Sequence, residues 1–115
     1  MFSQALVAAS LQPIVLSILS RGEAYGYDIM RHVDELSGGQ MLWTAGTLYP
    51  LMHRLESKGL IQAIWRPSTS GPRRKYYRIT EKGEQALSTE KSQWLGLHSM
   101  LMKLWGDELI LSPGI

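Results

Sequence analysis

Two short strand-like segments constrain the fold more than any other feature of the chain. Residues 60–66 and 75–80 are rich in Ile, Trp and Tyr, and they flank the polar segment 67–72, which reads PSTSGP. Such runs, separated by a few Pro, Ser and Gly residues, are typical of a β-hairpin with a polar tip. The rest of the chain carries helical periodicity, so the protein is predicted to be mainly α-helical with one small β-hairpin.

Three helices are expected before the hairpin, because apolar residues recur there every three or four positions. The first covers 11–19, and Pro13 suits an early helical turn, so 3–11 is either a separate short helix or a bent lead-in. Gly22 is expected in the C′ position that ends this helix. The second helix is predicted from about 27 to 36, and the short apolar segment 40–43 after it is a candidate strand.

The second helix is expected to bury one stripe of side chains. This stripe consists of Ile29, Val33 and Leu36, and Met30 lies at its edge. The spacing of these residues places them on one side of a helix with 3.6 residues per turn.

The third helix contains a proline. Thr44 is its expected N-cap, and it is predicted to end near Lys58. Four apolar residues face inward, namely Leu48, Leu51, Met52 and Leu55. Pro50 lies on the opposite face near the helix start, where water can reach the carbonyl that it leaves unpaired. The outward face, with Gly46, Pro50, His53, Arg54 and Ser57, is polar and low in relief and therefore suits DNA. A purely structural kink at Pro50 is the alternative.

Positive charge is concentrated around the hairpin. Between Arg54 and Lys82 there are eight Lys or Arg and two acidic residues, so this segment carries a charge of +6 and the rest of the chain −4. Three consecutive cations at 73–75 lie beside the hairpin tip, where they would gain affinity for DNA phosphates through counterion release. The two tyrosines at 76–77 point to opposite faces, so at most one is expected to be buried. An unevenly charged solvated surface with a solubilising turn is the alternative.

Residues 81–111 are predicted to form one long helix with an apolar seam. A heptad-like spacing relates Leu87 to Trp94 and Leu101, and Leu97 to Leu104. Further apolar surface comes from Trp105, Leu109 and Ile110. A small domain has little use for so long a stripe unless a second copy covers it, so we expect a homodimer across a two-fold axis. The alternative is that the helix folds back on its own domain.

Three helices, a hairpin and a long helix, in this order, describe a winged helix-turn-helix. We therefore expect a winged helix-turn-helix DNA-binding domain at 1–80, whose first helix joins the dimer, and a dimerisation helix at 81–115. In this fold the third helix enters the major groove, and the hairpin, called the wing, lies along the neighbouring minor groove or backbone.

Three motifs resemble the PadR family of transcriptional regulators. They are YGYDI at 25–29, GTLYP with RLE and KGLI over 46–61, and GPRRKYYRIT at 71–80. Each is weak alone, but together and in this order they are specific. The resemblance, to the short subfamily with one C-terminal helix, implies a homodimeric repressor on pseudo-palindromic operator DNA. By matching position, the implied DNA contacts are Tyr25, Thr47, Tyr49, Pro50, His53, Arg54, Arg73, Arg74 and Lys75.

The resemblance also implies a small-molecule effector. Some short members bind drugs and planar aromatic compounds between the tryptophans of two C-terminal helices, and Trp94 is similar in position. The implied effector site is Trp94, Leu97, His98 and Leu101. Two symmetry-related indoles would stack on a planar or aromatic compound, whose binding would release the repressor from DNA. The alternative is that Trp94 only packs the dimer seam.

Other functional classes find little support in the sequence. The chain has no cysteine, and its histidines at 32, 53 and 98 lie outside any metal-ligand motif. No Gly-rich phosphate loop or nucleophile elbow is present, so we expect neither an enzyme nor a cofactor or metal site. A winged helix used only for protein contacts is the main alternative to DNA binding, although such domains tend to lack a basic wing.

No apolar run reaches the roughly 18 residues of a membrane span. The first ten residues lack the basic region of a secretory signal. We therefore expect a soluble cytoplasmic protein without a membrane partner.

Overall fold

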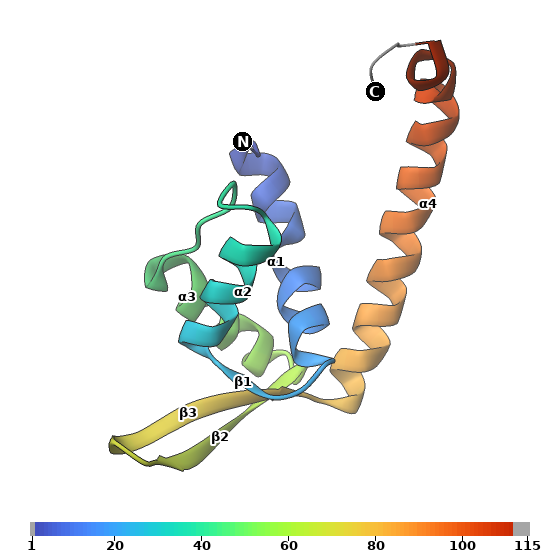
Figure 1. Ribbon diagram of the computed structural model, residues 1–115. Helices are drawn as coiled ribbons and strands as arrows, with labels where there is room; N and C mark the ends of the chain where they lie inside the picture. Colours follow the sequence, from blue (N-terminus) through green and yellow to red (C-terminus); the bar gives the residue numbers. More distant parts are fainter. Residues whose placement is uncertain (1, 112–115) are drawn as a thin grey trace.

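The computed structural model describes residues 2–111, with side chains through Gly106 (Figure 1). Met1 and residues 112–115 lie outside the described residues, as do the side chains of Leu109 and Ile110 in the predicted apolar seam. The elements are α1 (Gln4–Leu19), β1 (Ala24–Tyr25), α2 (Gly26–Leu36), α3 (Ala45–Ser57), β2 (Ile61–Ser68), β3 (Gly71–Ile79) and α4 (Glu81–Leu111). The predicted fold class, mainly helical with a small β-hairpin and a long C-terminal helix, is confirmed.

Helix α1 is one continuous helix with Pro13 inside it. Ser3 caps it, because the Ser3 hydroxyl oxygen accepts a hydrogen bond from the Leu6 N–H at 3.2 Å. The expected alternative of a separate short helix over 3–11 is therefore wrong. The helix ends at Leu19 and Ser20 is its C-cap, so the C′ residue is Arg21. Gly22, which was expected at C′, lies one residue further along the chain and has a φ of 146°.

Helices α2 and α3 occupy the predicted segments, with two corrections. Leu36 was expected in the buried stripe of α2, yet it is 71% exposed, because α2 ends there. Ile29 and Val33 are buried, and Met30 packs against the core from the edge of the stripe. Residues 40–43 form no strand. Instead the Ser37 hydroxyl accepts a hydrogen bond from the Met41 N–H at 2.9 Å, which holds this segment as a connection between the two helices.

The hairpin is the predicted one, with longer strands. Strands β2 and β3 are antiparallel, with Ala63 opposite Tyr77, and an irregularity between Arg66 and Ser68 accommodates Pro67. The two-residue strand β1 was not predicted, and it pairs with β3 so that Tyr25 lies opposite Tyr76. The sheet order is therefore β1-β3-β2. As expected, only one of the two tyrosines in β3 is buried, and it is Tyr77.

The core lies between the first three helices and the inner face of the sheet. The four residues of α3 predicted to face inward, Leu48, Leu51, Met52 and Leu55, are all buried. They pack with Val15 and Leu16 of α1 and with Ile29 of α2. Burial of one face of α3 leaves the opposite face, including Pro50, open to solvent.

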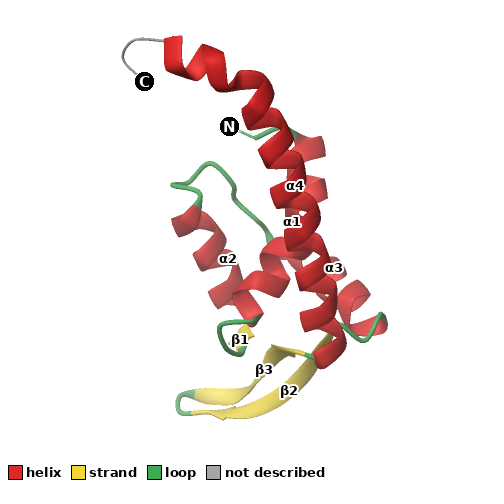
Figure 2. Cartoon of the chain, turned by 90° about the vertical axis from the view of Figure 1, so that its right-hand side faces the viewer, coloured by secondary structure: helices red, strands yellow, loops and turns green. Residues whose placement is uncertain are grey.

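Helix α4 leaves this core after its first two turns. Gly83 is buried against the hairpin, and Leu87 is the last buried residue of the helix that the structure describes. The side chains of Gln12 and Glu90 form a hydrogen bond between α1 and α4. Every residue from 91 to 100 is exposed, and Figures 1 and 2 show α4 running away from the domain.

Candidate nucleic-acid interface

The outward face of α3 presents the predicted polar residues. Pro50, His53 and Arg54 are exposed, Tyr49 is partly exposed, and Thr47 is half-buried. In the described part of the chain, Arg54 takes part in no ion pair. This face therefore offers uncompensated donors to a ligand that approaches α3 from solvent.

Tyr25 organises an aromatic cluster beside α3. It is the N-cap residue of α2, and its ring lies edge-on to Tyr76 with ring centroids 5.3 Å apart. It also stacks with Tyr27, with ring centroids 6.4 Å apart. The guanidinium carbon of Arg74 lies 4.8 Å from the centroid of the Tyr25 ring. A cation this close to a ring face is attracted by the π-electrons, so Arg74 is held in place while it stays exposed.

A hollow of about 430 Å³ opens at the N-terminus of α2. It is lined by Tyr25, Gly26, Tyr27, Tyr49, Arg74 and Lys75. Three elements that are distant in sequence meet there, namely the start of α2, the outward face of α3 and strand β3. The exposed N–H groups at the start of a helix favour an anion, and two cations lie beside them.

Lys75 connects the wing to α3. Its Nζ atom lies 4.0 Å from Glu56 Oε1 and 5.4 Å from the centroid of the Tyr77 ring. Both Lys75 and Glu56 are partly exposed, so this pair adds little to stability. Burial raises the pKa of the Tyr77 hydroxyl, so this ring stays neutral beside Lys75. Arg73 lies nearer the wing tip, is exposed and does not line the hollow.

Two other basic residues of the wing already have partners. Arg66 donates two hydrogen bonds to the Glu23 carboxylate, of which the one from a terminal guanidinium nitrogen to Oε2 measures 2.9 Å. The Arg66 guanidinium lowers the pKa of Glu23, mainly through this hydrogen bonding. Arg78 donates to Gln62 Oε1. In the described residues, Arg73 and Arg74 therefore take part in no ion pair and no side-chain hydrogen bond, and Arg78 keeps its charge because Gln62 is a neutral amide.

Sequence reasoning missed two residues of this cluster. Tyr27 is 60% exposed, and the guanidinium carbon of Arg31 lies 6.0 Å from its ring centroid. Gly26 permits the close approach of Tyr49 to α2, as the contacts of a Cβ at this position indicate. The sequence Tyr25-Gly26-Tyr27 could have indicated this aromatic cluster, because two tyrosines flank the glycine at which α2 begins.

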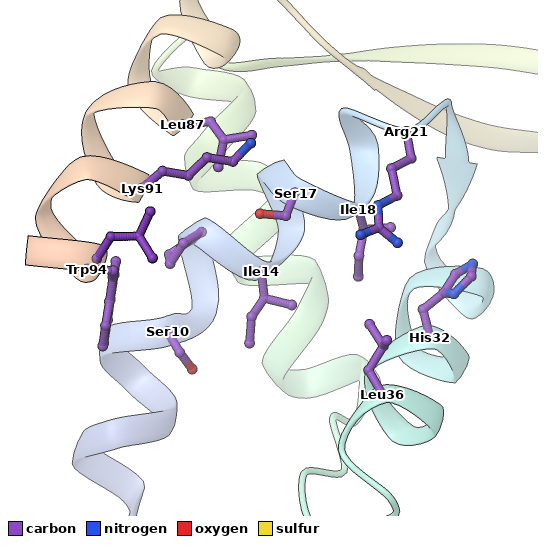
Figure 3. Close-up of a pocket in the computed structure, with 12 residues that line it drawn as sticks. Ser10, Ile14, Ser17, Ile18, Arg21, His32, Leu36, Leu87, Lys91 and Trp94 are labelled. Carbon is purple, nitrogen blue, oxygen red and sulfur yellow. The ribbon is translucent and has the colours of Figure 1, made fainter. Parts of the chain in front are cut away.

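The predicted effector residues lie on one face of α4. Trp94 borders a second cleft, of about 640 Å³, between α1, α2 and α4 (Figure 3). Leu97 and His98 are exposed and Leu101 is half-buried, and none of these three lines that cleft. In one chain the four residues thus share a helix face without forming a common pocket.

Comparison with known proteins decides the family. Residues 15–89 match the Transcriptional regulator PadR-like family. The chain belongs to this family. The resemblance drawn from the three motifs is thereby confirmed, and this PadR-like protein is a transcriptional regulator. Such regulators are in general not enzymes.

Similar proteins occur in several bacteria. An uncharacterised protein from Lysinibacillus sphaericus is 32% identical over 77% of this chain and 82% of its own length. The negative transcriptional regulator PadR of Bacillus subtilis is 30% identical over 88% of this chain, but the match spans only 53% of that protein.

Solved structures share the fold of this PadR-like regulator. A transcriptional regulator from Clostridium thermocellum has a TM-score of 0.81, with 28% identity over 90% of this chain and 97% of the other. A PadR family regulator from Eggerthella lenta is 40% identical, with a TM-score of 0.72 over 87% and 85% of the two chains.

Over residues 2–111, no helix is both long and apolar enough to span a membrane. Within the same described part, no three His, Asp or Glu side chains come together as a metal-binding group.

Proposed function

We propose that this regulator is a homodimeric repressor that binds pseudo-palindromic operator DNA through α3 and the wing. One observation carries the proposal. Residues from the start of α2, from α3 and from β3 meet in one basic and aromatic hollow, directly beside the open polar face of α3. A groove-reading helix flanked by phosphate-binding groups is the arrangement that winged helices use on DNA.

The contacts divide into two kinds. His53 and Arg54, with Thr47 and Pro50, lie on the face of α3 that would enter the major groove and approach base edges. Tyr25, Tyr49, Arg73, Arg74 and Lys75 lie beside it and would bind the sugar-phosphate backbone. The backbone group supplies affinity and register, whereas the α3 group supplies sequence preference.

Dimerisation is proposed through α4, with additional contacts from α1. Beyond residue 90 this helix exposes apolar side chains along its length, among them Trp94, Leu97, Leu104 and Trp105. Phe2, just before α1, and Leu6 in its first turn are exposed as well. A second copy related by a two-fold axis would cover these surfaces and set the two α3 helices about one DNA turn apart, roughly 34 Å.

The proposed effector is a small planar or aromatic compound at the dimer interface. Trp94, Leu97, His98 and Leu101 share one face of α4, so two copies would present two indoles across the axis. Such a compound would release the operator only if it prefers a dimer geometry in which the α3 spacing is wrong. Quenching of tryptophan fluorescence by a planar dye tests this step, with Trp94→Ala as the control.

The DNA-binding proposal is tested by an electrophoretic mobility shift. The probe is the DNA upstream of the protein's own gene, at two salt concentrations, with scrambled DNA as competitor. We expect a shifted band that survives the competitor at moderate salt. A band that the competitor removes at both salt concentrations would contradict sequence-specific binding, and it would favour a winged helix that contacts other proteins.

A further inference from the structure

Trp65 is an exposed aromatic residue of the wing that the DNA contacts proposed above do not include. It lies on β2 directly opposite Lys75 of β3. Trp65 is 58% exposed, whereas Ile61 and Tyr77 on the same two strands are buried. In the described part of the chain, the Trp65 ring forms no aromatic pair and no cation–π contact. The ring is therefore available to a ligand that approaches the wing from solvent.

The register of the hairpin decides which face of the sheet carries Trp65. Directly opposed residues of an antiparallel pair share a face, and so do residues two apart on one strand. Ile61, Ala63 and Trp65 therefore share a face with Tyr77 and Lys75. Because Ile61 and Tyr77 are buried, this is the face that packs on the core. At Trp65 the same face extends past the core and becomes open to solvent.

Two cations lie on this face of the wing together with the indole. Lys75 is the cross-strand neighbour of Trp65, and Arg73 follows on the same face towards the wing tip. The Lys75 Nζ atom also lies 4.0 Å from Glu56 Oε1, so this face adjoins the end of α3. A DNA strand whose phosphates reach both Lys75 and Arg73 would therefore pass over the Trp65 ring.

We propose that Trp65 packs against the deoxyribose sugars of the DNA backbone beside the wing. This contact rests on the proposed DNA binding and adds to it an interaction that involves no charge. A sugar with apolar C–H groups separates consecutive phosphates, and a flat indole covers such a surface while neighbouring cations hold the phosphates. An indole that shares its face with Lys75 and Arg73 suits an anionic polymer better than an uncharged protein surface.

The proposed dimer would leave Trp65 open to solvent. That dimer uses α4 beyond residue 90 and the start of α1, whereas Trp65 lies on β2. Figure 1 shows the hairpin projecting from one side of the domain and the far end of α4 lying at the other. The exposure of Trp65 in one chain is therefore expected in the dimer as well.

The test is the affinity of Trp65→Ala for the DNA upstream of its own gene and for scrambled DNA, at several salt concentrations. We expect a loss of about tenfold on both DNAs, as for the removal of about 60 Å² of apolar contact. The salt slope should stay unchanged, because no phosphate loses a cation. Arg74→Ala, in contrast, should lower this slope by about one unit. Trp65→Phe keeps a smaller ring and should lose less affinity than Trp65→Ala.

Leu42→Ala is the matched control for the loss of an exposed apolar side chain. Leu42 is 72% exposed and lies in the connection between α2 and α3, outside the proposed DNA interface. The affinity of this variant for both DNAs should equal that of the wild type.

Fluorine NMR of protein labelled with fluorotryptophan adds a readout in the wild type. The Trp65 signal, assigned by its absence in Trp65→Phe, should shift when either DNA is added. The signals of Trp94 and Trp105 on α4 should stay in place. Trp43 is buried, so an unchanged Trp43 signal verifies that Trp65→Ala is folded.

Three outcomes would overturn the proposal. If Trp65→Ala binds DNA as tightly as the wild type, the ring does not contact DNA, the operator proposal stands, and a protein partner becomes the better explanation. A loss confined to the upstream DNA, or a lowered salt slope, would identify a base or phosphate contact instead. A wild type that binds neither DNA would contradict the proposed DNA binding itself, and the Trp65 contact with it.

Discussion

The side chain of Tyr49 occupies the space in which a side chain on Gly26 would begin. A Cβ atom at Gly26 would lie 2.5 Å from the Tyr49 hydroxyl oxygen and 3.2 Å from Leu48 Cδ2. The first contact is closer than carbon and oxygen atoms approach without a bond. Gly26 therefore lets α3 approach the N-terminus of α2, and this approach places Tyr49 in the basic hollow.

Gly26→Ala is expected to destabilise the protein by no more than about 1 kcal/mol, the low end of overpacking, because the nearest atoms belong to the far end of the exposed Tyr49 side chain, which can turn away. Most of this loss should disappear in a Tyr49→Ala background, where the added methyl group meets only Leu48. Urea denaturation of the four proteins of this double-mutant cycle measures the coupling. An equal loss in both backgrounds would contradict the close approach as its cause.

Arg74→Ala should weaken binding to operator and scrambled DNA alike. Because Arg74 is a proposed phosphate contact, its removal should also lower the salt dependence of the affinity by about one unit of slope. Fluorescence anisotropy at several salt concentrations measures both quantities. An unchanged slope would remove Arg74 from the DNA contact surface.

Arg54→Ala serves as the contrasting variant. Arg54 lies on the outward face of α3, so its loss should relax the preference for one base pair by about 1–3 kcal/mol. Competition with operators altered at single positions measures this preference. Equal weakening on all sequences would identify Arg54 as a phosphate contact instead.

Leu104→Glu should convert the proposed dimer into monomers. Leu104 is 69% exposed in the single chain, so the substitution should cost little within one domain. In a dimer seam it would bury an unpaired charge, which is strongly unfavourable. Sedimentation velocity measures the outcome, with Lys103→Glu, on the face of α4 opposite Trp94, as the control. A Leu104→Glu protein that sediments as the wild type would place the dimer contact elsewhere.

Gly83→Ala should destabilise the fold by an amount on the order of 3 kcal/mol. A Cβ atom there would overlap the Leu60 carbonyl oxygen and lie 2.7 Å from Ile79 Cγ1, where backbone leaves no room to adjust. Gly96 in the same helix has no atom within 4 Å of the corresponding position. Gly96→Ala should therefore stabilise by up to about 1 kcal/mol through helix propensity. Thermal denaturation compares the Tm of the two variants, and a similar change in Tm for both would refute the steric explanation.

Glu23→Gln should remove a small pH-dependent contribution to stability. The pKa of Glu23 is lowered from 4.5 by hydrogen bonding to Arg66. The charged carboxylate thus stabilises the folded state above pH 4.5, and this contribution is lost as the pH falls below 4.5 through the lowered value. The wild type should exceed Glu23→Gln in Tm above pH 4.5 and approach it below. In an Arg66→Gln background the difference should vanish, and its persistence there would point to another partner.

The elements that were predicted correctly carry their signal locally. Helix α3 has its four inward residues at helical spacing, and the hairpin has a polar tip between two aromatic runs. Strand β1 has no such signal, because two residues at 24–25 become a strand only through hydrogen bonds to β3. Leu36 was wrongly predicted to be buried, because helical periodicity does not show at which residue a helix extends past the elements that it packs against.

The candidate site also consists of residues that local sequence predicts and of contacts that it does not predict. The cations at 73–75 and the outward face of α3 follow from local sequence. The contact between Tyr49 and Gly26 depends on the packing of α2 against α3, which no local pattern encodes. The cation–π contact between Arg74 and Tyr25 likewise depends on the pairing of β1 with β3.

The junction at Thr80 has a mechanical consequence. Thr80 is the only residue between β3 and α4, and its hydroxyl donates to the Gly59 carbonyl and accepts from the Gly83 N–H. With no loop between them, the end of the hairpin and the first turn of α4 are held together by these two hydrogen bonds. A rotation of the first turn of α4 would therefore be passed on to the base of the wing.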